Sequence, residues 1–157
     1  MEEEKNLIIE KIKERFPGVV KDAYSFRDLQ TVLIDKKSII DVCRFLKETH
    51  EFDFSYLVDL TAVDFPEKDV RFEMVYNLYS ISQSKRLFVK VNVDMDDLVV
   101  PSVTCLWESA NWAEREVYDM FGIKFSGHPN LKRLLMPDDF EGFPLRKEFE
   151  LDGEDEE

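Results

Sequence analysis

Cysteine and histidine are scarce in this sequence, with two of each among 157 residues. The cysteines, Cys43 and Cys105, form no C-x-x-C pair, and iron–sulfur and zinc sites need three or four closely spaced ligands. We therefore expect no such site within this chain. The expected state is two reduced, mostly buried thiols, because free cysteine is among the most buried residue types.

Long apolar runs and excess positive charge are also lacking. No apolar run approaches the roughly 18 residues that span a membrane. The acidic N-terminus also lacks the positively charged region followed by an apolar region that is typical of a signal peptide. Lys and Arg number 21 against 34 Asp and Glu, a net charge of −13, which disfavours nucleic acid and anionic membrane surfaces as partners. The sequence motifs of dinucleotide sites, phosphate-binding loops and nucleophile elbows are absent as well.

What is present predicts one α+β domain. Apolar periodicity and breaker residues indicate helices over residues 4–16, 38–50 and 111–121, and strands over 19–26, 29–35, 54–65, 71–81 and 87–93. The strand–helix–strand passage over 29–65 predicts a right-handed crossover with parallel pairing. We expect a mixed sheet with helices mainly on one face over residues 1–125, followed by an extended C-terminal arm with an acidic tail over 126–157.

Local signals predict how two of the helices begin and end. Ser38 with Asp41, and Asn111 with Glu114, have the spacing of an N-cap and a capping box. Gly122 fits the left-handed position that follows a helix C-terminus.

The third helix carries an acidic cluster with several possible roles. Glu114 and Glu116 point about 200° apart on a helix and cannot converge on one substrate. Glu116 and Asp119 share a face that could hold a hard metal ion. Alternatively, this face is solvated, with Arg115 and Asp119 in i,i+4 contact. In a third arrangement Glu116 is half-buried and paired with a basic residue of the arm, the candidates being Arg133, Arg146 and Lys147.

The arm itself is irregular but not polar. His128 is expected to be a hydrogen-bonded turn residue, because a lone His is more often that than a ligand or a base. Glycines and prolines favour a turning path, while eight apolar residues need a surface to cover them: Leu131, Leu134, Leu135, Met136, Phe140, Phe143, Leu145 and Phe149. The arm either wraps its own domain or lies across another subunit, and we favour the second because one small sheet offers limited surface.

Residues 109–149, SANWAEREVYDMFGIKFSGHPNLKRLLMPDDFEGFPLRKEF, closely resemble the signature region of the thirty-kilodalton subunit family of respiratory complex I, which in bacteria is the C subunit of the NADH–quinone oxidoreductase. The strands YLVDLTAVD and FEMVYNLYS upstream also resemble this family. One departure is Phe143, where many members carry His. The identities at fixed spacing are Glu114-Arg115-Glu116, Tyr118-Asp119, Phe121-Gly122-Ile123, Phe125, Gly127-His128-Pro129, Leu131, Arg133, Leu135, Glu141-Gly142 and Pro144-Leu145-Arg146-Lys147.

The resemblance implies an accessory, non-catalytic subunit of the peripheral arm. It implies packing against the forty-nine-kilodalton-type subunit near the quinone site, a partner that we call the quinone-site subunit. It implies no cofactor, metal or catalytic residue on this chain, with iron–sulfur clusters, FMN and quinone on partner subunits. It places the chain at the cytoplasmic face of the cell membrane, attached only through the complex.

The resemblance also leaves alternatives and implies a set of interface residues. Membrane-bound hydrogenases and ferredoxin-dependent complexes contain similar subunits, and a stand-alone metal-dependent enzyme is a further alternative. The expected subunit-interface residues are Glu114, Arg115, Glu116, Asp119, His128, Arg133, Pro144, Leu145, Arg146 and Lys147.

Overall fold

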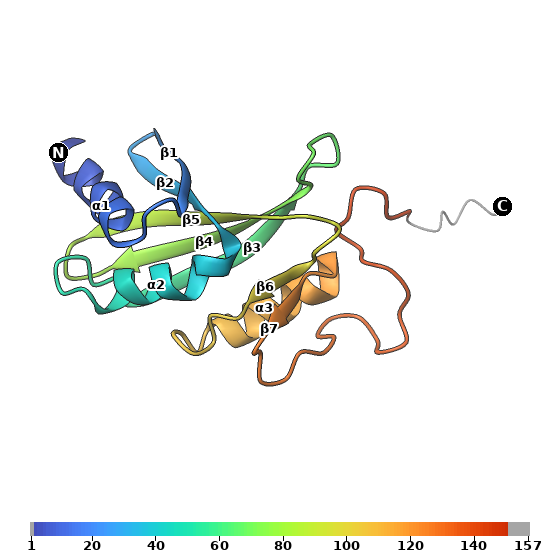
Figure 1. Ribbon diagram of the computed structural model, residues 1–157. Helices are drawn as coiled ribbons and strands as arrows, with labels where there is room; N and C mark the ends of the chain where they lie inside the picture. Colours follow the sequence, from blue (N-terminus) through green and yellow to red (C-terminus); the bar gives the residue numbers. More distant parts are fainter. Residues whose placement is uncertain (1, 151–157) are drawn as a thin grey trace.

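The computed structural model describes residues 2–150 of the chain (Figure 1). The three α-helices are α1 (Glu2–Arg15), α2 (Ile39–Glu48) and α3 (Ala110–Phe121), and a short 3-10 helix, η1 (Lys36–Ser38), leads into α2. The strands are β1 (Val20–Phe26), β2 (Leu29–Ile34), β3 (Tyr56–Asp64), β4 (Phe72–Ser80), β5 (Lys85–Val93), β6 (Val99–Pro101) and β7 (Lys124–Ser126).

The five long strands form one mixed sheet in the order β1-β2-β5-β4-β3. All neighbours are antiparallel except β2 and β5, which are parallel. The short strands β6 and β7 form a separate parallel pair beside α3 (Figure 1). The predicted α+β class with a mixed sheet is therefore confirmed.

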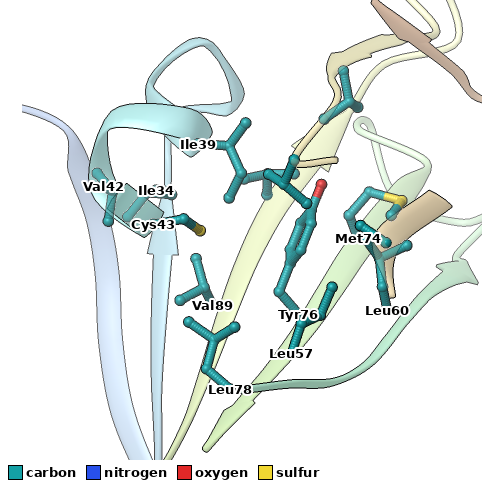
Figure 2. Close-up of a cluster of buried hydrophobic side chains, with 14 of the residues drawn as sticks. Ile34, Ile39, Val42, Cys43, Leu57, Leu60, Met74, Tyr76, Leu78 and Val89 are labelled. Atoms are coloured by element: carbon teal, nitrogen blue, oxygen red, sulfur yellow. The ribbon is translucent and has the colours of Figure 1, made fainter. Parts of the chain in front are cut away.

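One face of the sheet carries the core. In β4, alternate side chains from Phe72 to Ser80 are buried, while those between them are half-buried on the other face, as expected for a strand with one covered face. Figure 2 shows Ile39, Val42 and Cys43 of α2 packed over Tyr76 and Val89 of the sheet. Buried residues of α1 and α3 belong to the same core cluster.

The predicted parallel pairing between β2 and β3 is wrong. The chain does cross over from β2 to β3 through α2, but β3, β4 and β5 form an antiparallel meander, and β2 pairs with the free edge of β5. The short β4–β5 connection is consistent with this arrangement, because consecutive strands joined by a short connection usually pair with each other. Two strands consequently separate β2 from β3.

Ser38 occupies the predicted N-cap position of α2 and Gly122 the predicted position after α3, whereas the predicted N-cap at Asn111 is wrong. The side chain of Asp35 accepts a hydrogen bond from the Lys37 amide at 3.0 Å, while Ser38 makes no side-chain cap bond. The residue that precedes α3 is Ser109, again without a side-chain cap bond, because its hydroxyl donates to the Leu57 backbone oxygen at 3.3 Å. Gly122 follows α3 in the left-handed region at φ 79°.

The two cysteines differ in environment. Cys43 lies on the buried face of α2, but Cys105 is exposed, so the expectation of two buried thiols is wrong for Cys105. Residue 105 lies in the turns between β6 and α3, where its side chain is exposed.

The first residue of the arm, Ser126, ends β7, and residues 127–150 contain no helix or strand and run past the end of α3 (Figure 1). None of the helices among the described residues has the length and apolarity to cross a bilayer.

Candidate functional site

Asp119 is the centre of the first group of contacts that hold the arm. Its side chain is fully buried in α3, and its Oδ2 accepts hydrogen bonds from the amides of Leu134, Leu135 and Met136 at 3.2, 2.6 and 2.9 Å. Pro137 has no N–H and ends this run of donors. Burial alone would raise the pKa of the Asp119 carboxyl, but the amide donors and the Arg133 guanidinium outweigh it and lower the pKa.

Arg133 completes this group, which we call the helix anchor. Its Nη1 donates to Oδ1 and to the backbone oxygen of Asp119 at 3.0 and 3.1 Å. Its Nη2 donates to the backbone oxygens of Phe140 and Gly142 at 3.0 and 2.9 Å. A planar guanidinium suits this role because it presents several donors in a fixed geometry. One side chain therefore joins α3 to two separate points of the arm.

Arg115 and Glu116, on the same helix as Asp119, do not take part in the helix anchor. Arg115 donates to the backbone oxygens of Lys132 and Arg133 at 3.3 Å each, so it contacts the arm and not Asp119. Glu116 is exposed, and no ion pair involving it is present in the described chain. The predicted Arg115–Asp119 contact and the half-buried position of Glu116 are therefore wrong. Both expectations followed from the apolar stripe of α3, but the arm covers the side of the helix that carries Asp119.

The arm meets α3 again at the C-terminus of the helix. The Leu145 amide donates to the Met120 oxygen at 3.0 Å, and Arg146 Nε donates to the Phe121 oxygen at 2.7 Å. These oxygens belong to the last turn of the helix, where backbone carbonyls lack intrahelical partners and attract positive charge. Close packing at Gly122 leaves no room for a side chain: an added Cβ would lie 2.7 Å from Arg146 Nη2.

A third set of contacts, the sheet anchor, holds the end of the described arm to the edge strand β3. Asp64 is buried, and its carboxylate accepts two bonds from Arg71 at 2.7 Å each and one from the Lys147 amide at 2.8 Å. Arg71 also pairs with Glu148. The bond from Arg71, which outweighs the opposing effect of burial, lowers the pKa of Asp64.

Sequence reasoning missed Asp64 and Arg71, although a signal was present. Leu60 and Ala62 set the inward-facing alternation of β3, and Asp64 continues it. An acidic residue at an inward position requires a partner. Arg71 directly precedes β4, the strand that pairs with β3.

Glu114 lies apart from the arm. Its buried carboxylate accepts hydrogen bonds from Ser102 Oγ at 2.6 Å and from the Val103 amide at 2.8 Å, so it joins α3 to the turn after β6. No basic side chain pairs with it among the described residues, and burial raises its pKa to about 7 against the opposing effect of both bonds. Its carboxylate therefore does not cap α3 as the capping box predicted.

His128 is the hydrogen-bonded turn residue that its sequence context indicated. Its Nδ1 accepts from the Asn130 amide and its Nε2 lies 3.0 Å from the Asn111 backbone oxygen. Because Nδ1 accepts, the neutral ring carries its proton on Nε2 and donates to Asn111. Both ring nitrogens are thus occupied by backbone groups.

These contacts define what the site can do chemically. No group of three or more potential metal ligands occurs in the described part of the chain, and both oxygens of Asp119 are bound by N–H donors, so Glu116 and Asp119 cannot share a metal as the arrangement stands. The arm instead encloses an open hollow of about 850 Å³ between its two anchors, which Pro144 and Arg146 help to line. Leu145, 53% exposed, points away from the protein's own core.

Comparison with known proteins agrees with this description. The family model for the respiratory-chain NADH dehydrogenase 30 Kd subunit matches residues 32–155. The C subunit of the NADH-quinone oxidoreductase of Geobacter sulfurreducens is 45% identical over 155 residues, which cover 98% of this chain and 94% of the relative. The corresponding protein of a Roseiflexus species is 43% identical, with 94% of this chain and 85% of the relative covered.

Two solved structures share the fold. A trypsin-resistant fragment of Nqo5 superimposes with a TM-score of 0.61 at 33% identity, covering 79% of this chain and 99% of the fragment. A chain of the membrane-bound sulfane sulfur reductase, described as an archaeal respiratory membrane complex, superimposes with a TM-score of 0.78 at 27% identity over 94% of this chain and 86% of that chain. From the family model and the nearly full-length relatives together, this chain belongs to the 30 Kd subunit family of the respiratory-chain NADH dehydrogenase.

Proposed function

We propose that this chain is an accessory, non-catalytic subunit of the peripheral arm of a complex I-type NADH–quinone oxidoreductase. It packs against the quinone-site subunit. The iron–sulfur clusters, FMN and quinone of the complex are bound by partner subunits. The chain is held at the cytoplasmic face of the membrane through those subunits, without lipid contact of its own.

The observation that carries this proposal is the anchored arm. An irregular segment normally stays solvated and mobile, yet this one is fixed to α3 and to β3 by buried carboxylates. It nevertheless exposes apolar side chains, with Leu135 58% and Leu145 53% exposed. Fixing a segment in advance reduces the conformational entropy lost on association, which supports a role in docking.

The contacts divide the expected interface residues into two roles. Asp119, Arg133 and Arg146 bind the arm from within and position it. Exposed residues such as Glu116, Leu145 and Lys147 are free to meet the partner. In this proposal residues 1–125 form the supporting domain and residues 126–157 the docking arm.

A second candidate is the equivalent subunit of a related membrane-bound hydrogenase or ferredoxin-dependent complex. The similarity to a chain of the sulfane sulfur reductase over 94% of this chain favours considering it. The 45% identity to the Geobacter relative, against 27% to that chain, favours the NADH–quinone complex.

Affinity purification of the tagged chain from native membranes tests the proposal. We expect the quinone-site subunit, flavin and iron–sulfur absorbance, and NADH–quinone reductase activity to accompany the tag. The chain purified alone should be colourless. Hydrogen- or ferredoxin-dependent activity in the purified complex would support the second candidate. A metal-dependent activity of the chain alone, lost in Glu116→Ala, would instead indicate a stand-alone enzyme.

Truncation then tests whether the arm carries the association. A chain ending after Asn130 retains β7 and the buried Ile123 and Phe125, so its domain should stay folded. Loss of partner recovery is expected for this variant but not for a control that ends after Glu150. Equal recovery of both would contradict a docking role for the arm.

A further inference from the structure

The hollow within the arm is bounded mainly by apolar groups. Met136, Phe140, Phe143, Pro144 and Phe149 line it, and the rings of Phe140 and Phe149 stack with their centroids 6.0 Å apart. A volume of about 850 Å³ is in the range of a site that holds several side chains. Such a surface open to solvent is the kind that a partner covers.

The exposed charged side chains that line this hollow are acidic, and Arg146, which also lines it, is half-buried. The two arginines of the arm turn inward, where Arg133 binds backbone oxygens and Arg146 packs its guanidinium 4.5 Å from the Phe143 ring centre. The rim instead carries the exposed carboxylates of Glu141, Glu148 and Glu150. Glu148 pairs with Arg71, while Glu141 and Glu150 make no ion pair within residues 2–150.

From this apolar floor and acidic rim we propose that the hollow receives a basic, apolar segment of a partner polypeptide. An aliphatic or aromatic side chain enters between Phe143 and Phe149, and flanking Lys or Arg residues pair with Glu141 and Glu150. The proposal rests on the proposed function and specifies the chemistry of the partner at the arm. Charge opposes a second copy of this chain as the occupant, because each copy carries a net charge of −13.

The anchors on either side of the hollow make it a preformed site. The helix anchor fixes residues 133–136, and the sheet anchor fixes residues 147 and 148. Gly142 lies between them, where the ring of Phe149 would be 3.1 Å from an added Cβ. The segment between the anchors therefore keeps its curved path without the partner, which reduces the cost of binding.

Photo-crosslinking of the complex in native membranes identifies the occupant. Glu141→p-benzoylphenylalanine places the probe on the rim, and Glu48→p-benzoylphenylalanine places it at the far end of α2 as a matched control (Figure 1). We expect position 141, but not position 48, to crosslink a peptide of another subunit in which an apolar residue adjoins Lys or Arg. The proposal is overturned if the crosslinked peptide is acidic, or if it belongs to this chain or to a second copy. It is also overturned if an intact complex gives no crosslinked product.

Charge reversal measures the contribution of the rim. The double variant Glu141→Lys and Glu150→Lys should lower recovery of the partner about tenfold and shift its release to lower salt. The control Glu48→Lys and Glu51→Lys makes the same charge change at exposed positions remote from the arm. Equal recovery of both variants overturns the proposed partner chemistry but leaves the proposed function standing. Failure of the unmodified chain to recover any quinone-site subunit overturns the proposed function itself.

Discussion

Replacing Asp119 with Asn should detach the near end of the arm while leaving the sheet folded. The carboxylate accepts bonds from three amides and from Arg133, and Asn has nearly the same shape. Its NH₂ group is a donor, however, so it must face either the amides or the guanidinium. The substitution also removes the charge that balances Arg133, whose side chain is only 12% exposed.

Breaking a buried charge pair from one side costs about 3–5 kcal/mol. The penalty falls on the contact between α3 and the arm, because Asp119 makes no bond to the sheet among the described residues. At the lower figure of about 3 kcal/mol, the population with the arm detached rises on the order of a hundredfold.

Hydrogen exchange followed by mass spectrometry measures this population directly. The amides of residues 134–136 should exchange on the order of a hundredfold faster in Asp119→Asn, with no change in β4 and β5. Glu116→Gln removes one exposed charge from the same helix and serves as the control. Equal protection of residues 134–136 in both variants would refute the assigned role of Asp119.

The pH dependence of the same protection provides an independent check. The pKa of folded Asp119 lies below its ordinary value, so the folded state binds fewer protons than the unfolded state as the pH falls. Its stabilisation is fully present above the unfolded pKa of about 3.9 and is lost as the pH falls through the folded pKa. Protection factors of the native chain should therefore decline in acid, and those of Asp119→Asn should not show this decline.

Three further predictions concern stability and reactivity. Burial raises the pKa of Glu114 to about 7, so the folded state holds a proton that the unfolded state releases near pH 4. The free energy of unfolding should therefore fall as the pH rises from about 4 to 7. Urea unfolding of Glu114→Gln should show this fall reduced by up to about 3 kcal/mol. Gly122→Ala, which combines positive φ with a clash, should lower the free energy of unfolding by more than about 2 kcal/mol, whereas Gly127→Ala, with positive φ but nothing within 4 Å, should cost about 1 kcal/mol; similar costs would contradict the close approach at the end of α3. A thiol reagent should label Cys105 and spare Cys43, whose pKa is raised by burial, and equal labelling of both in the folded chain would contradict their assigned environments.

The regular parts of this fold follow from local patterns in the sequence. Each of β4 and β5 buries one face, so strict alternation from Phe72 and from Leu87 identified both strands. The partner of β2 could not be predicted in this way. Alternation shows which side chains turn inward but not which strand lies alongside, and that depends on the edge that the β4–β5 hairpin leaves free.

The arm contacts were predicted only in part, because they join residues that are distant in sequence and follow no period. Glu114 and Asn111 have the spacing of a capping box, yet the partner of the Glu114 carboxylate is Ser102, outside the helix. The family resemblance placed Asp119 and Arg133 among ten expected interface residues, but it did not pair them, because their burial and their contact depend on the path of the arm. Asp64 was missed because the alternation of β3 was not extended to its final residue.

The strand order also constrains how the chain folds during synthesis. Val32 in β2 pairs with Val89 in the parallel strand β5, and more than fifty residues must be added before that partner exists. The β1–β2 hairpin and α2 therefore leave the ribosome with their apolar faces uncovered until β5 emerges. Contacts this distant in sequence slow folding and prolong the exposure of aggregation-prone surface. For a newly made subunit, the interval between synthesis of residues 34 and 93 is consequently when chaperones have the most to protect.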